Sequence, residues 1–415
     1  MPFYPLTKQA LVSLALTLPL VSCGDGGTDP ADLIDVTIVS GDGQSTELGE
    51  TLSQELVVRA SDALGNTAPN ISVVFSVVQG GGSLSTTAVR TDLQGMASST
   101  WTLGNQEGPQ GVTVSAVINS GADATFSAVA TDFDIELVFI TNGTPSQDAV
   151  FLAAADRWMG ILRGELPDVD FSVNPVPANS CTEGQPSVSS TIDDLRIYVQ
   201  ITPIDGIFGT LAQAGPCQIR TTSQLPVLGF IELDAADVTR LEQDGDLMDV
   251  ILHEMGHVLG IGTLWDNFAN LLVNPSLPSN PGVDTHFAGA AAVAAFDVAG
   301  GTAYTGGAKV PVDNEASVGS SDAHWRESVL GLELMTPALT AGITNPLSAI
   351  TTESLVDLGY GVESSAADPF AKTFSAPARV TTAGGRVIDL TNDTYRGPIQ
   401  IVDHSGNVIR TIFAR

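Results

Sequence analysis

The hydrophobic and polar positions of residues 34–131 alternate over short stretches that are separated by glycine-containing polar clusters. Such clusters favour turns. Short alternating strands at this spacing are typical of an antiparallel sandwich of about 100 residues. The strand-like runs are Asp35–Val39, Glu55–Ala60, Ile71–Val78, Ala97–Leu103, Val112–Ile118 and Thr125–Ala130. The pattern therefore predicts an N-terminal all-β domain over residues 34–131.

The pattern changes after residue 131, where helical periods appear between strands. The predicted strands are Ile135–Ile140, Leu195–Thr202 and Val227–Leu233, and the predicted helices start after Thr144, at Leu247 and at Ser348. This mixture predicts an α+β domain over residues 132–361. The strand Val227–Leu233 shortly precedes the helix at Leu247. We expect this strand to form the rim of a cleft, where an extended peptide can add by main-chain hydrogen bonds.

The remaining residues, 362–415, read as a tail with a β-hairpin. Two strand-like runs, Ile399–Val402 and Val408–Ile412, surround the turn Ser405-Gly406-Asn407. The sequence does not decide whether this tail packs on the preceding domain or serves assembly, and nothing in it specifies an oligomeric state.

The N-terminal pattern predicts an export signal. Residues 1–22 have a positive start at Lys8 and an apolar stretch up to Leu20. Together with Cys23 they resemble a bacterial lipoprotein signal, and the resemblance implies a lipid on Cys23 and an outer-membrane lipoprotein facing the periplasm or the cell surface. The other reading is an ordinary signal peptide with an incidental cysteine. Residues 23–33 would be a tether to the first domain.

Composition and charge narrow the partners. The 415 residues include 16 basic and 47 acidic ones, for a net charge of −31, so we expect no nucleic acid partner. No stretch after the signal is long enough to span a membrane, which leaves the lipid anchor as the only membrane contact. Export would place Cys181 and Cys217 in an oxidising compartment, and we predict that they form a disulfide.

The candidate chemistry lies in His253-Glu254-Met255-Gly256-His257. Two of the chain's five histidines fall here, four residues apart. On a helix this spacing puts both imidazoles on one face, where they can hold zinc. Glu254 can then act as a base that takes a proton from a metal-bound water during attack on a carbonyl. H-E-x-x-H on a helix is the pattern of zinc peptidases.

A catalytic zinc usually takes a third protein ligand. The short metzincin signature puts a histidine six residues after the second one, but Thr263 stands there. Gly260, which would let the chain leave the helix in a left-handed turn, is present. The third ligand must therefore come from further along the chain, and the remaining histidines are His286, His324 and His404.

The set formed by His253 to Gly260, a long insertion, His324 and Met335 resembles the leishmanolysin family of metzincins. The resemblance covers residues 132–361. It implies that His253, His257 and His324 bind one zinc ion, that Glu254 is the general base, and that Met335 forms a hydrophobic floor under the metal. His286 remains an alternative third ligand. A thermolysin-like site would instead take a glutamate, with Glu315 and Glu327 as candidates that lack a helical setting.

Other residues add details without a decided role. Asp322 and Glu327 flank His324 and either orient its imidazole or are solvated. His404 lies in a turn context and is expected on the surface. Calcium is compatible with the many aspartates, but no motif indicates it.

Residues 34–131 also resemble a bacterial immunoglobulin-like domain of the invasin and intimin type. The resemblance rests on stretches such as 57–66, Gly80-Gly81-Gly82-Ser83-Leu84 and Trp101-Thr102-Leu103-Gly104. It implies a spacer.

These observations together predict a zinc-dependent metalloendopeptidase that hydrolyses peptide bonds of extracellular or envelope proteins. The alternative is a surface adhesin or binding protein whose metal domain is not catalytic.

Overall fold

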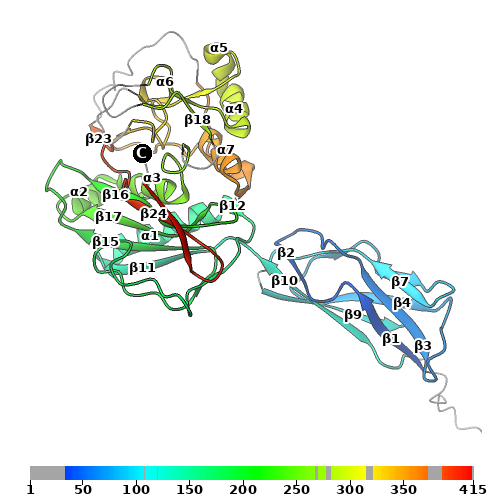
Figure 1. Ribbon diagram of the computed structural model, residues 1–415. Helices are drawn as coiled ribbons and strands as arrows, with labels where there is room; N and C mark the ends of the chain where they lie inside the picture. Colours follow the sequence, from blue (N-terminus) through cyan, green and yellow to red (C-terminus); the bar gives the residue numbers. More distant parts are fainter. Residues whose placement is uncertain are drawn as a thin grey trace, which may run out of the picture. The chain divides into compact units, whose positions relative to one another are not determined.

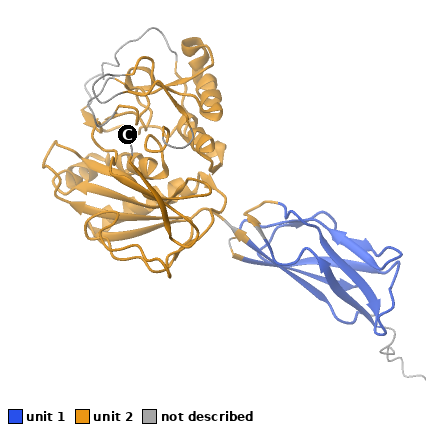
Figure 2. Cartoon of the chain, in the orientation of Figure 1, with its two compact units in different colours: residues 1–44, 51–105, 109–129 blue, residues 45–50, 106–108, 130–415 orange. Residues whose placement is uncertain are grey.

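The computed structural model describes residues 33–106, 108–118, 120–266, 270–276, 282–314, 321–372 and 386–413. The predicted signal peptide, Cys23, nearly all of the tether, and Glu315 lie outside these ranges. The chain forms two compact units (Figures 1 and 2). The first comprises residues up to 44, 51–105 and 109–129, and the second comprises 45–50, 106–108 and 130–415.

The first unit is built from β-strands in two main sheets. One sheet has the order β1-β3-β7, and the other has the order β2-β10-β9-β4-β6. The strands are β1 (Ile34–Ser40), β2 (Gln44–Glu47), β3 (Leu56–Asp62), β4 (Ser72–Gln79), β5 (Ser83–Leu84), β6 (Ala88–Arg90), β7 (Met96–Ser99), β8 (Trp101–Thr102), β9 (Gly108–Ala116) and β10 (Ala124–Thr131).

Alternating side chains explain why these strands form a sandwich. In β3, Leu56, Val58 and Ala60 are buried while Arg59 between them is exposed. Because successive side chains of a strand point to opposite faces, each sheet buries one face and leaves the other in water. Trp101 lies fully buried in the same unit.

The second unit is a mixed α/β domain around a six-stranded sheet of order β11-β15-β17-β16-β24-β25. Strands β11, β15 and β17 are parallel, whereas β16 runs antiparallel to β17. The strands are β11 (Ile135–Thr141), β15 (Leu195–Thr202), β16 (Ala212–Arg220), β17 (Pro226–Asp234), β24 (Pro398–Val402) and β25 (Val408–Phe413).

Two helices cover this sheet close to the site. Helix α1 (Pro145–Met159) starts with a capping box between Thr144 and Gln147. It packs on α3 (Leu247–Leu259), and the indole Nε1 of Trp158 donates a 3.1 Å hydrogen bond to the carbonyl oxygen of Leu252. Helix α3 also contacts β16 and β17, so it lies between the sheet and the second half of the domain (Figure 1).

The remaining elements of the second unit are short. They are β12 (Leu162–Arg163), β13 (Val169–Asp170), β14 (Thr191–Ile192), α2 (Val238–Asp244), β18 (Leu272–Val273), β19 (His286–Phe287), α4 (Ala290–Phe296), a π-helical turn (Asp297–Gly301), α5 (Thr302–Thr305), β20 (Val310–Pro311), α6 (Glu327–Leu330), β21 (Ala338–Thr340), α7 (Ala349–Leu358), β22 (Gly361–Val362), a 3-10 turn (Ser364–Ala366) and β23 (Val387–Asp389). No helix in the described parts of the chain is long and apolar enough to cross a membrane.

The prediction that Val227–Leu233 forms the rim of the cleft is wrong. This run belongs to β17, which is paired on one side with β15 and on the other with β16. Its backbone groups are therefore taken and cannot bind a peptide. The neighbouring strand β16 was not predicted from the sequence pattern, because Gly215 and Pro216 interrupt it.

Residues after 361 are not an appended tail. The predicted hairpin is present as β24 and β25, and β24 pairs with β16 in parallel register, Gln218 to Arg220 against Gln400 to Val402. These residues complete the central sheet of the second unit. A disulfide joins Cys181 to Cys217 of β16, with the two Cα atoms 5.4 Å apart.

Candidate metal centre

Helix α3 places His253 and His257 one turn apart on the face that points away from the sheet. Every residue of this helix except Met248 is buried, because the sheet covers one side and the loops of the second half cover the other. Gly260 ends the helix in a left-handed conformation with φ of 112°. A Cβ atom at this position would lie 2.8 Å from Leu264 Cδ1, so both backbone and packing favour glycine.

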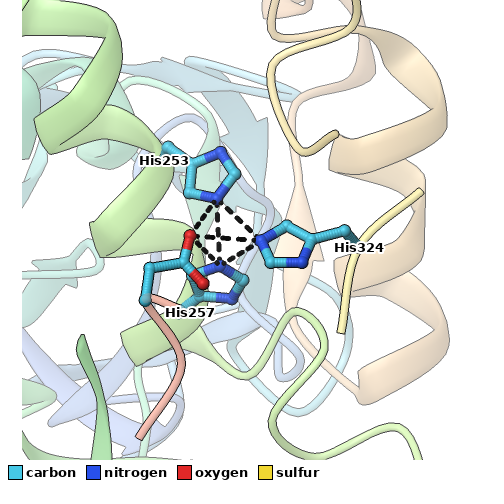
Figure 3. Close-up of side chains that lie close together, drawn as sticks. His253, His257 and His324 are labelled. Atoms are coloured by element: carbon cyan, nitrogen blue, oxygen red, sulfur yellow. Dashed lines mark hydrogen bonds and ion pairs between the residues drawn. The ribbon is translucent and has the colours of Figure 1, made fainter. Parts of the chain in front are cut away.

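His324 reaches the same point from a separate loop (Figure 3). Its carbonyl oxygen accepts a hydrogen bond from the backbone N–H of Asp313, at 2.8 Å. The next residue, Trp325, donates its backbone N–H to the carbonyl of Met335 at 2.9 Å and its indole N–H to Thr351 Oγ1 at 2.8 Å. These bonds fix the position of the third imidazole.

The three imidazoles converge through their Nε2 atoms (Figure 3). The Nε2–Nε2 distances are 3.0 Å between His253 and His257, 3.1 Å between His253 and His324, and 3.1 Å between His257 and His324. The other ring nitrogen of His253 lies 2.7 Å from the carbonyl oxygen of Leu334, and that of His257 lies 2.9 Å from the carbonyl oxygen of Ile261.

These carbonyl contacts decide which nitrogen carries the proton. A carbonyl oxygen only accepts, so Nδ1 of His253 and of His257 must donate, and each neutral ring then has a lone pair on Nε2. Burial lowers the pKa of His253, which favours the neutral form. Lone pairs that face one another at about 3 Å repel unless a cation lies between them, so the donor set fits a metal ion.

A carboxylate that the sequence analysis missed joins the three imidazoles. Asp393 Oδ2 lies 3.1 Å from His253 Nε2, 3.2 Å from His324 Nε2 and 3.6 Å from His257 Nε2. Burial tends to raise the pKa of Asp393, but the imidazoles of His324 and His257 outweigh it and hold this pKa well below its usual range. Histidines and glutamates were the candidate third ligands in the sequence, and no local pattern distinguishes Asp393 from the other aspartates.

Glu254 is fully buried beside this group. Neither of its carboxylate oxygens has a hydrogen-bond partner among the residues that the structure describes. Burial raises the pKa of Glu254 well above its usual range, and the charge of Asp393 raises it further. An unpartnered buried carboxylate is costly, and it fits a site where a water or substrate group supplies the missing hydrogen bond.

Met335 lies under α3. A Cβ atom on Gly256, the residue before His257, would be 2.8 Å from Met335 Sδ. The thioether is fully buried and therefore packs directly against the helix that carries two of the imidazoles. Its backbone N–H donates to Glu333 Oε2 at 2.7 Å, which holds the turn in place.

The other candidate residues lie elsewhere. His286 belongs to β19, and its Nδ1 lies 2.6 Å from the carbonyl oxygen of Asp284, so it is not part of the converging group. His404 is exposed. The carboxylate of Asp322 accepts hydrogen bonds from the backbone N–H and hydroxyl of Ser276, at 2.6 and 2.9 Å. Glu327 is the first residue of the short helix α6.

A second acidic group consists of Glu165, Asp168 and Asp193, all exposed. Burial of part of the side chain and the neighbouring carboxylates raise the pKa of Glu165 to about 8. We assign no ion to this group.

Comparison with known sequences identifies a family for part of the second unit. Residues 168–376 match the sequence model of the peptidase M8 family, described as leishmanolysin. The matched range contains the three histidines, Glu254 and Met335, whereas Asp393 lies beyond its end. No curated protein matches the chain significantly.

Solved structures that resemble the chain include adhesin domains. The D00-D0 domain of intimin is 19% identical, with a TM-score of 0.21, over 26% of this chain and 52% of that chain. The Yersinia pseudotuberculosis adhesin InvE is 17% identical, with a TM-score of 0.21, over 24% of this chain and 32% of that chain. The chain thus spans about half of the first and a third of the second. Similarities this low carry no argument about the fold.

Proposed function

This chain belongs to the leishmanolysin family, and we propose that it is a zinc-dependent metalloendopeptidase that cleaves extracellular or envelope proteins. The observation that carries the proposal is the convergence of three imidazoles beside the buried, unpartnered carboxylate of Glu254. A purely structural zinc site needs no such carboxylate.

Each residue has a defined part in this proposal. His253, His257 and His324 would hold one zinc ion, which supplies a Lewis acid for the scissile carbonyl and lowers the pKa of coordinated water toward about 7. Glu254 takes a proton from the attacking water and passes it to the leaving amine.

The metzincin architecture is part of the proposal. It is supported by the left-handed exit of α3 at Gly260 and by Met335 packed against Gly256 beneath the histidines. We further propose that the chain is exported as an outer-membrane lipoprotein anchored at Cys23, with the first unit as a spacer. The disulfide between Cys181 and Cys217 supports export, because such bonds persist in oxidising compartments.

The test is the substitution Glu254→Gln, assayed for casein or gelatin hydrolysis and for bound zinc. The variant keeps the three imidazoles, so we expect zinc to stay bound. Hydrolysis should fall by about 10²–10⁴-fold because the base is lost. The exposed Glu183→Gln change is the matched control and should leave both unchanged. If the wild type and the Asp393→Ala variant both bind zinc but neither hydrolyses protein, the adhesin alternative is favoured.

A further inference from the structure

Asp393 belongs to a segment that returns to the site from beyond the family match. We call residues 386–395 the returning segment. Its carboxylate is buried with the imidazoles, and its second oxygen, Oδ1, has no hydrogen-bond partner within the described ranges. A buried carboxylate with one oxygen among three imidazole nitrogens needs a physical reason.

The geometry of the four donor atoms supplies this reason. The distances among the three Nε2 atoms and Asp393 Oδ2 run from 3.0 to 3.6 Å. A tetrahedron with edges of about 3.2 Å has its centre about 2.0 Å from each corner, which is the distance at which zinc binds imidazole nitrogen or carboxylate oxygen. The carboxylate oxygen therefore lies at the fourth corner of a tetrahedron whose size fits a zinc ion.

A fourth protein ligand changes what the site can do. Catalytic zinc sites combine three protein ligands with one position for water or substrate, whereas sites with four protein ligands are closed. With Asp393 Oδ2 in place, the fourth position is taken by the chain itself.

The backbone of the returning segment also occupies the edge of the sheet next to the site. Ala214 of β16 donates its N–H to the carbonyl of Asp393, and its own carbonyl accepts from the N–H of Tyr395, both at 2.8 Å. These are the backbone groups with which an exposed strand would bind an extended peptide. A Cβ atom on Gly215 would lie 2.8 Å from Tyr395 Cβ, so glycine at this position allows the close approach.

The first part of the returning segment is β23, which pairs with β21. Strand β21 follows directly after the turn that carries Met335. Ile388 and Leu390 are buried there. Beside the segment lies a cavity of about 230 Å³, lined by the loop from Asp205 to Ala212 and by residues 389–393. Asp393 is itself one of the residues that line this cavity.

We propose that Asp393 is a fourth metal ligand and that the returning segment is an internal inhibitor, which must leave the metal and the edge of β16 before a peptide binds. The inhibitory part rests on the peptidase function proposed above; the ligand part does not. The form described here is then the latent one.

The ligand part is tested with the Co²⁺-loaded full-length protein and acetohydroxamate, a small bidentate metal ligand followed by the visible spectrum of Co²⁺. In the wild type, acetohydroxamate must displace the carboxylate, and its apparent affinity falls by the fraction of molecules that are open. We expect Asp393→Ala, and the near-isosteric Asp393→Asn, to bind it at least about ten times more tightly than the wild type. Equal affinity in all three proteins would overturn the proposal.

The control is Glu183→Gln, an exposed glutamate outside the returning segment and outside the cavity beside it; it should bind acetohydroxamate like the wild type. Circular dichroism verifies that each variant is folded. If Asp393→Ala does not fold, Asp393→Asn is compared with the wild type in its place.

The inhibitory part is tested by peptide hydrolysis with the zinc-loaded proteins. We expect Asp393→Ala to be at least about ten times faster than the wild type and Asp393→Ala combined with Glu254→Gln to be inactive. An equal or slower rate for Asp393→Ala in an active enzyme would overturn the inhibitory role. If acetohydroxamate binding changes as expected but no variant cleaves peptide, the ligand assignment stands and the peptidase function fails.

Discussion

Helix α3 and the returning segment both bring donors to one point, yet they do so in different ways. In α3 the two histidines are carried by a helix whose backbone bonds are internal, and their rings are oriented by the nearby carbonyls of Leu334 and Ile261. In the returning segment, Asp393 is held by pairing with other strands, at β21 and at Ala214 of β16.

This difference indicates which donors are hard to remove from the site and which are easier to remove. Removing α3 from the site would require unfolding the helix and the core under it. The two backbone hydrogen bonds between the returning segment and Ala214 are of the kind that an incoming peptide strand could form instead, so their loss on exchange would be offset. Donors that are fixed by a helix and a donor that is held by strand pairing thus meet at one point.

The largest expected effect comes from removing one of the three converging histidines. His324 comes from a loop, but its backbone is fixed by Asp313 and Trp325, so we group it with the histidines of α3. Changing His324→Ala should lower zinc affinity by more than about 100-fold, since loss of residues that only orient a ligand already costs about 10–100-fold. Competition with a chromophoric chelator measures this.

The matched control is His286→Ala, which removes a half-buried histidine outside the converging group. Its zinc affinity should stay within about twofold of the wild type. A larger loss for His286→Ala than for His324→Ala would show that the donor set is assigned wrongly.

A second prediction concerns the buried Glu333, which holds the turn that carries Met335. It accepts hydrogen bonds from the Met335 N–H and the hydroxyls of Ser348 and Thr351. Burial raises the pKa of Glu333 to about 7 from the usual 4.5. The folded state therefore binds more protons than the unfolded state between these values, and the free energy of unfolding decreases as pH rises.

Glu333→Gln removes this titration. The difference in the free energy of unfolding, variant minus wild type, should increase by up to about 3 kcal/mol as the pH rises from about 4.5 to 7. Above this window the difference should be constant. Urea unfolding at a series of pH values measures it. Parallel pH profiles for the two proteins would contradict the raised pKa.

The smallest expected effect comes from an ion pair at the start of the returning segment. Arg386, at its start, pairs with Asp244 at 2.5 Å between two partly exposed side chains. Such a pair contributes about 0.2–1 kcal/mol. Arg386→Ala should therefore raise acetohydroxamate affinity by at most about fivefold, and less at high salt.

Arg410→Ala, an exposed arginine on β25, is its control and should change nothing. An increase for Arg386→Ala as large as that for Asp393→Ala would mean that the ion pair, and not the metal, holds the segment.

Much of the fold could be predicted from local patterns. The capped start of α1 at Thr144 and Pro145, the glycine ends of α3 and α7, and the hairpin of β24 and β25 all follow from residues close together in the sequence. Strand β16 could not, because its central Gly215 and Pro216 lack the features of a strand. Pairing with β17 on one side and β24 on the other makes it one.

The sequence by itself determined the chemistry that depends on helical spacing: two histidines and a glutamate on adjacent turns, with a glycine that ends the helix. The choice of His324 came from the resemblance to the leishmanolysin family, because the residues alone left His286 and His404 open as well. Only the tertiary structure decided that Asp393 joins them, since an aspartate in a polar stretch has no local mark and its burial depends on strands that meet from 180 residues apart. Local bonds follow from neighbours in sequence, whereas a ligand delivered by long-range pairing is fixed only when the whole sheet has formed.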